Sequence, residues 1–476
     1  MGIIHKESIR LNRVEAIDNK FTVELDFSDG VQKWFKSNRL FVESDQKLDK
    51  TDESILSVPA LSAVVAVAWA AGADVYLESI DASFLRSLKK VELIFRTWFP
   101  RFSFTTEMHV NNVVSNVSSS RRCALLCSGG LDSLASYLKH REQRPTLISV
   151  WGADIPTCEN TYWNLARRNL EEFATQEGVN IHFVKTNSRE IINEKFATRN
   201  FLRIGEEWYR TVTHGLILVG SAAPLLANKF ESLLVASSQY KYKFEPNGSL
   251  LFHYADVSFG GTRVVYDDYE STRLEKVRYI LECNPRYFSH LVACNSWRRF
   301  SGRPMVLNCC ICEKCLRTIA ELAIENIDPR CGNFPLEKTE STFKFIEACL
   351  QHGVLTSDRS LLGEEWKDIQ SNIFTIIGNC RTHYNLIKGS REFFDWFKTF
   401  NLGEASCMSN EILRYLLNWW LSAKYNGSKY TASHLLGISN HWIIKSIRRH
   451  TRLHTEAQKD QIACVKKSSD SNTAVV

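Results

Sequence analysis

The feature that most constrains this chain is the segment 127–133, which reads Cys-Ser-Gly-Gly-Leu-Asp-Ser. It follows a short apolar run at 124–127 and precedes apolar residues at helical spacing in 134–139. Adjacent glycines let the backbone approach a polyphosphate closely, and a helix that starts beside them adds amide groups and its positive dipole end. The sequence therefore predicts a phosphate-binding turn between a strand and a helix.

The sequence around this segment alternates short apolar runs with longer segments at helical spacing. We expect strands at 124–127, 146–150, 181–185 and 232–236, and helices at 134–139, 159–177, 212–229, 269–281 and 316–324. This alternation is typical of βαβ units, so the fold class is α/β with a doubly wound parallel sheet. In such sheets the functional loops lie at the carboxyl ends of the strands.

The rest of the chain divides by composition. We expect an N-terminal α+β domain at 1–116, with strands at 21–25 and 91–95 and a helix from Pro59, followed by a polar linker. The α/β domain takes 121–335, an aromatic-rich C-terminal helical domain takes 336–465, and 466–476 is a disordered tail.

Composition favours a soluble, cytoplasmic protein. Of the 476 residues, 44% are hydrophobic and 24% charged, and fourteen cysteines occur without a signal peptide, which indicates a reducing compartment. The uncharged run 54–73 is at the margin of membrane-spanning length, but its alanine content favours a buried helix. The net charge of +6 permits nucleic-acid contact without arguing for it, and the basic run 445–452 fits an exposed helix end better than a nucleic-acid site.

Each residue of the turn has an expected role. The glycines direct amides at phosphate, the two serine hydroxyls donate to the same oxygens, and Asp132 holds the loop or a bridging Mg²⁺. The alternative is an ordinary turn in which Asp132 caps the following helix. The residues expected to bind ATP are Ser128, Gly129, Gly130, Leu131, Asp132 and Ser133.

A cysteine cluster is the second strong signal. Cys309, Cys312 and Cys315 form a C-x-x-C-x-x-C pattern, and fourteen residues separate Cys294 from Cys309, across a loop with glycine and proline. Four thiolates predict a closed, structural zinc site, with Cys310 as the spare residue. An iron–sulfur cluster, redox-active thiols, unliganded buried cysteines and an exchange of Cys310 for Cys309 remain alternatives.

Other polar residues are candidates for binding or catalysis. Ser238 follows the strand at 232–236, and Asp256 in an aromatic and glycine-rich stretch could face a guanine-like edge. Arg273 and Lys276 share one helix face, where they could neutralise the leaving pyrophosphate, and Arg317 follows the cysteines. For each, a solvated surface residue is the alternative. The expected catalytic residues are Asp132, Ser133, Lys276 and Arg317; the expected substrate-binding residues are Ser238, Asp256 and Arg273.

The S-G-G-x-D-S string resembles the signature of the PP-loop, or N-type, ATP pyrophosphatases. With the cysteine pattern and Arg317 after it, the segment 122–327 resembles the 7-cyano-7-deazaguanine synthase (QueC) family, whose four cysteines bind zinc beside the active site. The large flanking domains make the chain more similar to the enlarged QueC-like proteins of bacterial anti-phage operons, such as QatC and those of type IV CBASS systems.

The resemblance implies an adenine nucleotide alpha hydrolase-like fold that uses ATP, Mg²⁺ and Zn²⁺. It implies adenylation of a carboxylate, that of 7-carboxy-7-deazaguanine, with release of pyrophosphate and transfer of the acyl group to ammonia or to an amino group of a partner protein from the same operon. Two alternatives are a tRNA-modifying enzyme that adenylates a base oxygen, and a scaffold of a defence complex that binds ATP without turnover.

Overall fold

The computed structural model describes residues 6–202, 206–238, 246–294, 305–336, 339–351, 355, 362–378 and 387–402. The chain forms two compact units. Unit 1 comprises Met1–Trp297, Val306–Asn308 and Cys331–Asn333, and unit 2 comprises Arg298–Met305, Cys309–Arg330 and Phe334–Val476. The expected domain boundaries stay predictions.

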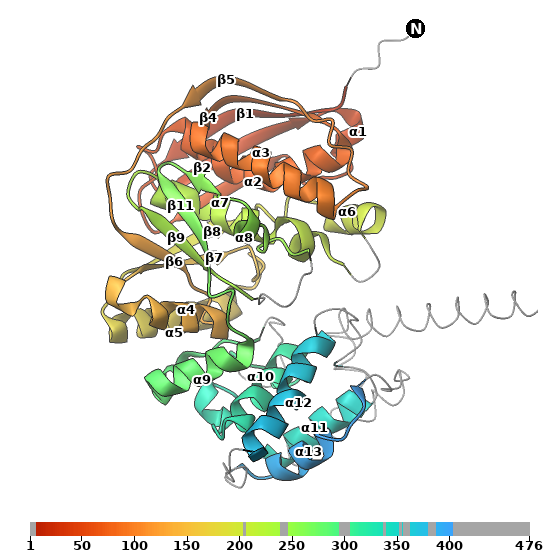
Figure 1. Cartoon of the computed structure of the whole chain (residues 1–476). Coiled ribbons are helices and arrows are strands. Elements are labelled where there is room, and N and C mark those ends of the chain that lie inside the picture. Colours follow the sequence, from red (N-terminus) through yellow and green to blue (C-terminus); the bar gives the residue numbers. More distant parts are fainter. Residues whose placement is uncertain are drawn as a thin grey trace, which may run out of the picture. The chain divides into compact units, whose positions relative to one another are not determined.

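Unit 1 is built on a mixed, mostly parallel sheet of eleven strands in the order β10-β11-β9-β6-β7-β8-β3-β2-β1-β4-β5 (Figure 1). The strands are β1 Ser8–Ile17, β2 Lys20–Phe27, β3 Arg39–Ser44, β4 Asp74–Asp81, β5 Met108–Val114, β6 Cys123–Leu126, β7 Thr146–Trp151, β8 Ile181–Thr186, β9 Ser232–Ala236, β10 Ser258–Phe259 and β11 Thr262–Asp267. The chain is therefore an α/β protein, as expected.

The helices of unit 1 connect and cover these strands. They are α1 Asp29–Gln32, α2 Glu53–Ala71, α3 Ala82–Trp98, α4 Leu131–Lys139, α5 Asn160–Glu177, α6 Glu194–Phe201, α7 His214–Leu226, α8 Leu251–Tyr254 and α9 Arg273–Cys283. The expected strands at 124–127, 146–150, 181–185 and 232–236 correspond to β6 to β9, and the strand at 21–25 lies in β2. The helices expected at 134–139, 159–177, 212–229 and 269–281 correspond to α4, α5, α7 and α9.

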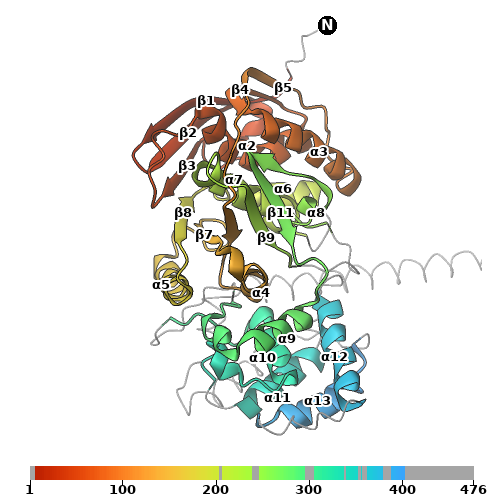
Figure 2. The same cartoon turned by 60° about the vertical axis from the view of Figure 1, so that its left-hand side comes forward.

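In the parallel part of the sheet, successive strands are added first on one side of β6 and then on the other. The chain proceeds from β6 to β7 and β8 on one side, then returns to place β9 and β11 on the other side, all in parallel (Figure 2). The connections after β6 and after β9 therefore diverge at the carboxyl ends of two neighbouring strands. Such a switch point is where ligands bind in open α/β sheets.

The N-terminal strands extend the same sheet rather than forming a separate one. β3 pairs antiparallel with β8, with Val42 opposite Thr186, and β2, β1, β4 and β5 continue the sheet to its other edge. Strands from before and after residue 116 therefore belong to one hydrogen-bonded sheet, which the polar linker in the sequence did not indicate.

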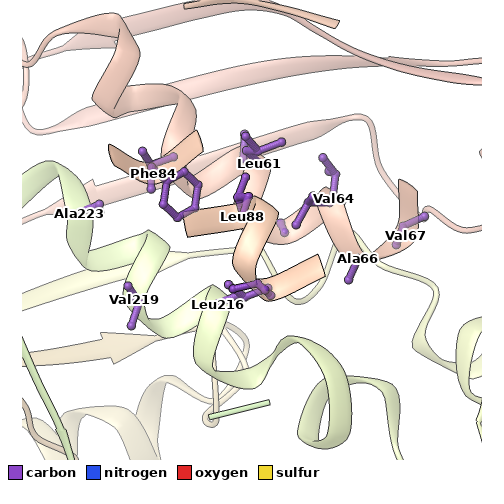
Figure 3. Packing of buried hydrophobic residues seen from close by; sticks show 14 of the residues in the cluster. Leu61, Val64, Ala66, Val67, Phe84, Leu88, Leu216, Val219 and Ala223 are labelled. Carbon is purple, nitrogen blue, oxygen red and sulfur yellow. The ribbon is translucent and has the colours of Figure 1, made fainter. Parts of the chain in front are cut away.

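The buried core of this part is centred on α2, which packs on β1, β4 and α7. Figure 3 shows side chains of α2, α3 and α7 in one cluster, among them Leu61, Leu88 and Val219. Among the described residues, α2 alone is long and apolar enough to cross a membrane, and 94% of that apolar window is buried inside the structure. The run 54–73 is thus the buried helix expected from its alanine content.

The strand expected at 91–95 is wrong, because these residues lie in α3. Phe84, Leu88, Val91 and Phe95 are buried at helical spacing along one face of α3, which begins with Asp81 accepting a hydrogen bond from the Phe84 amide. The five apolar and β-branched residues suggested a strand because that window is too short to show the helical period.

Unit 2 is helical in its described residues. It contains α10 Glu313–Ile324, which corresponds to the helix expected at 316–324, together with α11 Thr339–Gln351, α12 Leu362–Gly378 and α13 Ser390–Phe397. Phe343 of α11 packs against Phe393 of α13, and Trp366 of α12 packs edge-on against Phe397. Aromatic side chains of the three helices therefore pack against one another. The basic run 445–452 and the expected tail 466–476 lie outside the described residues.

A close approach between α2 and α7 yields a prediction about stability. A Cβ added at Gly220 of α7 would lie 2.5 Å from the Ser62 Cβ of α2. We expect Gly220→Ala to lower the free energy of unfolding by about 1–3 kcal/mol, because overpacking outweighs the better helix propensity of alanine. Chemical denaturation of the purified protein measures the difference.

The control is the double variant Gly220→Ala with Ser62→Gly, which removes the side chain that the new Cβ would meet. A double-mutant cycle should give a favourable coupling between the two changes. If the costs of the single changes simply add, the α2–α7 contact does not require glycine at this position.

Candidate phosphate loop and metal centre

The segment 127–130 forms a tight turn between β6 and α4. Gly129 has φ +73°, in the left-handed region that favours glycine. A Cβ there would also lie 3.2 Å from the Val292 Cγ2 atom. Both the backbone conformation and the packing therefore explain glycine at this position.

The start of α4 has no side-chain cap. Gly130 occupies the N-cap position, and this residue makes no side-chain cap hydrogen bond. Ser128 Oγ accepts from the Gly130 amide at 3.3 Å, and Ser133 Oγ donates to the Gly130 carbonyl at 3.0 Å. Asp132 is thus not the helix cap that the alternative interpretation proposed, and first-turn amides of this kind are suited to an anion.

Asp132 instead faces two cations of α9. Its carboxylate lies 3.1 Å from Lys276 Nζ and 3.3 Å from Arg273 Nη1. α9 begins with a capping box, in which Thr272 and Glu275 bond each other's backbone amides. The shared face expected for Arg273 and Lys276 is confirmed, and both side chains reach the first turn of α4.

Lys276 also connects the two loops at the switch point. Its side chain is 2% exposed, and Nζ donates to the backbone carbonyl of Ser237, directly after β9. The Ser237 amide in turn donates to the Asp267 carbonyl at the end of β11. One ammonium therefore ties the exit of β9 to α4, and Ser238 follows as an exposed residue at this edge.

Cys127 lies under the loop and is not a reactive thiol. Burial raises the pKa of this thiol, and this effect exceeds the hydrogen bonds from the Gly129 amide and Ser133 that lower it. The thiol therefore stays protonated near neutral pH. The polar groups at this turn are the loop amides, the hydroxyls of Ser128 and buried Ser133, and the Asp132 carboxylate with its two cations.

The four expected metal ligands lie together. The Sγ atoms of Cys294, Cys309, Cys312 and Cys315 are all within 4.8 Å of one another, and all four residues are buried. The Sγ atoms of Cys309 and Cys315 are 3.9 Å apart. A tetrahedral zinc with Zn–S bonds of about 2.3 Å requires sulfur atoms about 3.8 Å apart. This cluster could therefore hold a metal such as zinc.

Cys310 stands apart from this group. It is absent from the set of four, and its backbone has φ +58°, which turns the chain between Cys309 and the α10 N-cap residue, Cys312. The Cys312 amide donates to Cys309 Sγ at 3.3 Å, a contact that supports a thiolate. This geometry favours Cys309 over Cys310 as the ligand.

Sequence reasoning missed the residues that fix the segment containing Cys294. Asn308 is fully buried; its Oδ1 accepts from the Ala293 and Cys294 amides, and its Nδ2 donates to the carbonyls of Leu291 and Gly332. Tyr162 Oη donates to the Cys294 carbonyl at 3.1 Å. The only signal for Asn308 was an asparagine directly before Cys309, which does not reveal partners so far along the chain.

The same segment contacts the phosphate loop. The Val292 amide donates to the Gly129 carbonyl at 2.8 Å, and Asn169 Nδ2 donates to the His290 carbonyl at 2.8 Å. Val292 is two residues from Cys294. One short segment therefore carries the expected metal ligand Cys294 and also bonds to the phosphate loop.

Arg317 lies in a different environment from Lys276. Its guanidinium is 4% exposed and faces Glu313 at 2.7 Å, Glu321 at 3.5 Å and Glu365 of α12. Burial alone would lower the pKa of Arg317, but the three carboxylates raise it well above its usual value. Burial raises the pKa of Glu313 despite the opposing effect of Arg317. This arrangement favours a structural role, and the catalytic role stays a prediction.

Asp256 is also placed apart from the Asp132 cluster. Its carboxylate is 86% exposed and pairs with Lys90 of α3 at 3.1 Å, beside β10 at the edge of the sheet. Its substrate-binding role stays a prediction. Most of the loop between Ser238 and Asn247 lies outside the described residues.

No protein-family model matches this chain, and comparisons with curated proteins and with solved structures gave no match either.

The cysteine cluster yields a prediction about metal content. We expect the purified protein to carry about one zinc per chain, because four converging thiolates form a closed tetrahedral site. Cys312→Ser should lose most of this metal and lower the melting temperature, since the ligand segment also fixes the α10 N-terminus. Elemental analysis by mass spectrometry and a thermal melt measure the two effects.

Cys310→Ser is the matched control and should keep the metal. Equal metal loss in both variants would contradict the assignment of Cys309 as the ligand. Wild-type protein that carries iron with visible absorption would favour an iron–sulfur cluster instead.

Proposed function

We propose that this chain is a PP-loop ATP pyrophosphatase with an adenine nucleotide alpha hydrolase-like domain, which adenylates a carboxylate and transfers the acyl group to an amine. The observation that carries the proposal is the Ser-Gly-Gly-Leu-Asp-Ser loop at the β6–β9 switch point, with Lys276 and Arg273 gathered on Asp132. A turn that serves only to connect a strand to a helix does not require two cations with little solvent exposure beside its carboxylate.

In the proposed first half-reaction, the β and γ phosphates of ATP are bound by residues 128–133, with Gly129 and Gly130 allowing close approach of the backbone. A carboxylate oxygen of the substrate attacks the α phosphorus, and the bond to the bridging oxygen of pyrophosphate breaks. Lys276 and Arg273 offset the charge that accumulates on the leaving pyrophosphate. Asp132 would help to hold Mg²⁺, which would supply further positive charge for the phosphates. The rate gain comes mainly from positioning and charge stabilisation.

In the proposed second half-reaction, an amine attacks the acyl-adenylate and AMP leaves. Resemblance to the QueC family supports 7-carboxy-7-deazaguanine as the carboxylate, and ammonia or an amino group of a partner protein as the acceptor. Resemblance to the enlarged QueC-like proteins supports a cytoplasmic role in bacterial anti-phage defence. Ser238, exposed at the edge beyond β9, is the residue we propose for substrate contact.

The metal would have a structural part in this scheme. Cys294, Cys309, Cys312 and Cys315 would hold zinc with no open position for a substrate. The hydrogen bond from Val292 to Gly129 is the path by which a fixed cysteine segment would hold the phosphate loop in its turn.

The proposal predicts release of AMP and pyrophosphate from ATP and Mg²⁺ that depends on 7-carboxy-7-deazaguanine. Asp132→Ala and Lys276→Met should each lower this release about 100-fold or more, because the first removes the group that orders both cations and the second removes a buried charge beside the phosphates. Chromatographic separation of AMP from ADP gives the product, and a melting curve confirms that each variant is folded.

Lys89→Met is the matched control, because Lys89 is an exposed residue of α3. It should behave as wild type. If wild-type protein binds ATP but releases no AMP with the carboxylate, the adenylation proposal fails. Release that begins only when tRNA is added would instead identify an RNA-modifying enzyme.

A further inference from the structure

A second polar cluster lies at the carboxyl edge of the same sheet, where side chains from the connections after β7 and after β9 meet. Asp154 lies in the connection after β7, and His214 is the first residue of α7. Ser249 precedes α8, in the connection after β9. Close contacts join the three side chains in series, an arrangement that the spacing in the sequence does not reveal.

His214 lies between the other two side chains of this cluster. Its Nδ1 atom lies 2.7 Å from Ser249 Oγ, and its Nε2 atom lies 3.4 Å from Asp154 Oδ1. Solvent exposure rises from Ser249 through His214 to Asp154: Ser249 is 3% exposed, the His214 side chain 27% and the Asp154 side chain 52%. The Nε2 side of the ring is therefore the side nearer to solvent.

The cluster is held in place by close backbone contacts. The Gly215 amide donates to the Gly248 carbonyl at 3.1 Å, and a side chain at Gly215 would collide with that carbonyl. The Ser249 amide donates to Asn247 Oδ1 at 2.9 Å. His214 also follows the π-helical turn Tyr209–Thr213, a distortion that is frequent at functional sites.

Two further side chains surround the solvent-facing end. Tyr209 Oη lies 3.4 Å from Asp154 Oδ1, and the Arg189 guanidinium stacks over the Tyr209 ring at 3.9 Å. Arg189 in turn pairs with Glu194 at 2.7 Å and donates to the Ala153 carbonyl. Contacts with Tyr209, and of Arg189 with the neighbouring Ala153, therefore help to orient Asp154.

This order of groups suits a base and not a nucleophilic serine. In serine hydrolases the hydroxyl meets the substrate, whereas Ser249 is the buried member here. If Nδ1–H donates to Ser249 Oγ, the lone pair of Nε2 is left on the side of Asp154. An ammonium group that binds between Asp154 and Nε2 can then donate hydrogen bonds to both the carboxylate and the ring nitrogen.

We propose that His214 is the general base of the amine-transfer step, with Asp154 and Ser249 as its positioning residues. This rests on the proposed function, and it assigns the second half-reaction to this part of the sheet edge. The ammonium form of the acceptor pairs with Asp154, and an N–H proton passes to His214 Nε2. The amine lone pair forms the C–N bond, the bond from the carbonyl carbon to the AMP oxygen breaks, and AMP leaves with that electron pair.

The test compares two acceptors in wild type and His214→Gln. Ammonia is mostly protonated at neutral pH and needs a base, whereas hydroxylamine is mostly neutral and reacts with acyl-adenylates without one. His214→Gln should lose about 100-fold or more of the ammonia-dependent rate. It should keep carboxylate-dependent ATP–pyrophosphate exchange and hydroxamate formation near the wild-type rates. His109→Gln, on the edge strand β5, is the matched control and should change none of these rates.

Equal loss with both acceptors, or an unchanged ammonia rate, would overturn the assignment of His214. The absence of carboxylate-dependent exchange in wild type is a different result, because it counts against the proposed function as a whole.

A measurement on the protein alone keeps the inference testable in that case. Nitrogen NMR of histidine-labelled protein, assigned with His214→Gln, should show the Nδ1–H tautomer of His214 at neutral pH. Ser249→Ala should shift the ring toward the Nε2–H tautomer, since the acceptor for Nδ1–H is gone. A wild-type ring fixed in the Nε2–H tautomer would overturn the proposed base, whatever the activity.

Discussion

The buried ammonium of Lys276 is the interaction on which the candidate site depends. It contacts Asp132 in the first turn of α4 and the Ser237 carbonyl after β9, so one side chain joins three separate connections of the sheet. A lysine that is 2% exposed is costly to desolvate unless its charge is met by an acid and a carbonyl. Removing the Asp132 carboxylate would leave that charge without its acid, and the contact between them holds α4 and α9 together.

The topology explains why this interaction occurs where it does. β6 and β9 are neighbours in the sheet, but the chain leaves β6 toward β7 and leaves β9 toward β11. Their connections diverge, and Lys276 of α9 bonds to a residue in each of them, Asp132 after β6 and Ser237 after β9. The N-terminal strands widen the sheet through the β3–β8 pair, on the side of β6 that is away from β9.

The sequence predicted what local patterns determine and missed what distant contacts determine. β6 to β9 were found because buried parallel strands are short apolar runs bounded by turns, and Arg273 and Lys276 were placed on one face by helical spacing alone. The strand expected at 91–95 failed because a five-residue window carries no period. Asn308 and His214 could not be found, since their partners lie in other parts of the chain and neither residue belongs to a recognisable motif.

The hydrogen bond between the segment that carries Cys294 and the phosphate loop restricts the backbone conformation of the loop. Gly129 holds a left-handed backbone, a conformation that glycine adopts easily but that is also easily lost, because glycine has many others available. The Val292 amide removes that freedom by bonding the Gly129 carbonyl, and Asn308 and Tyr162 fix the segment that carries Val292. A metal on Cys294 would reduce the motion of this segment further. A metal held there would favour binding of a ligand at the loop through conformational entropy, without any contact between metal and ligand.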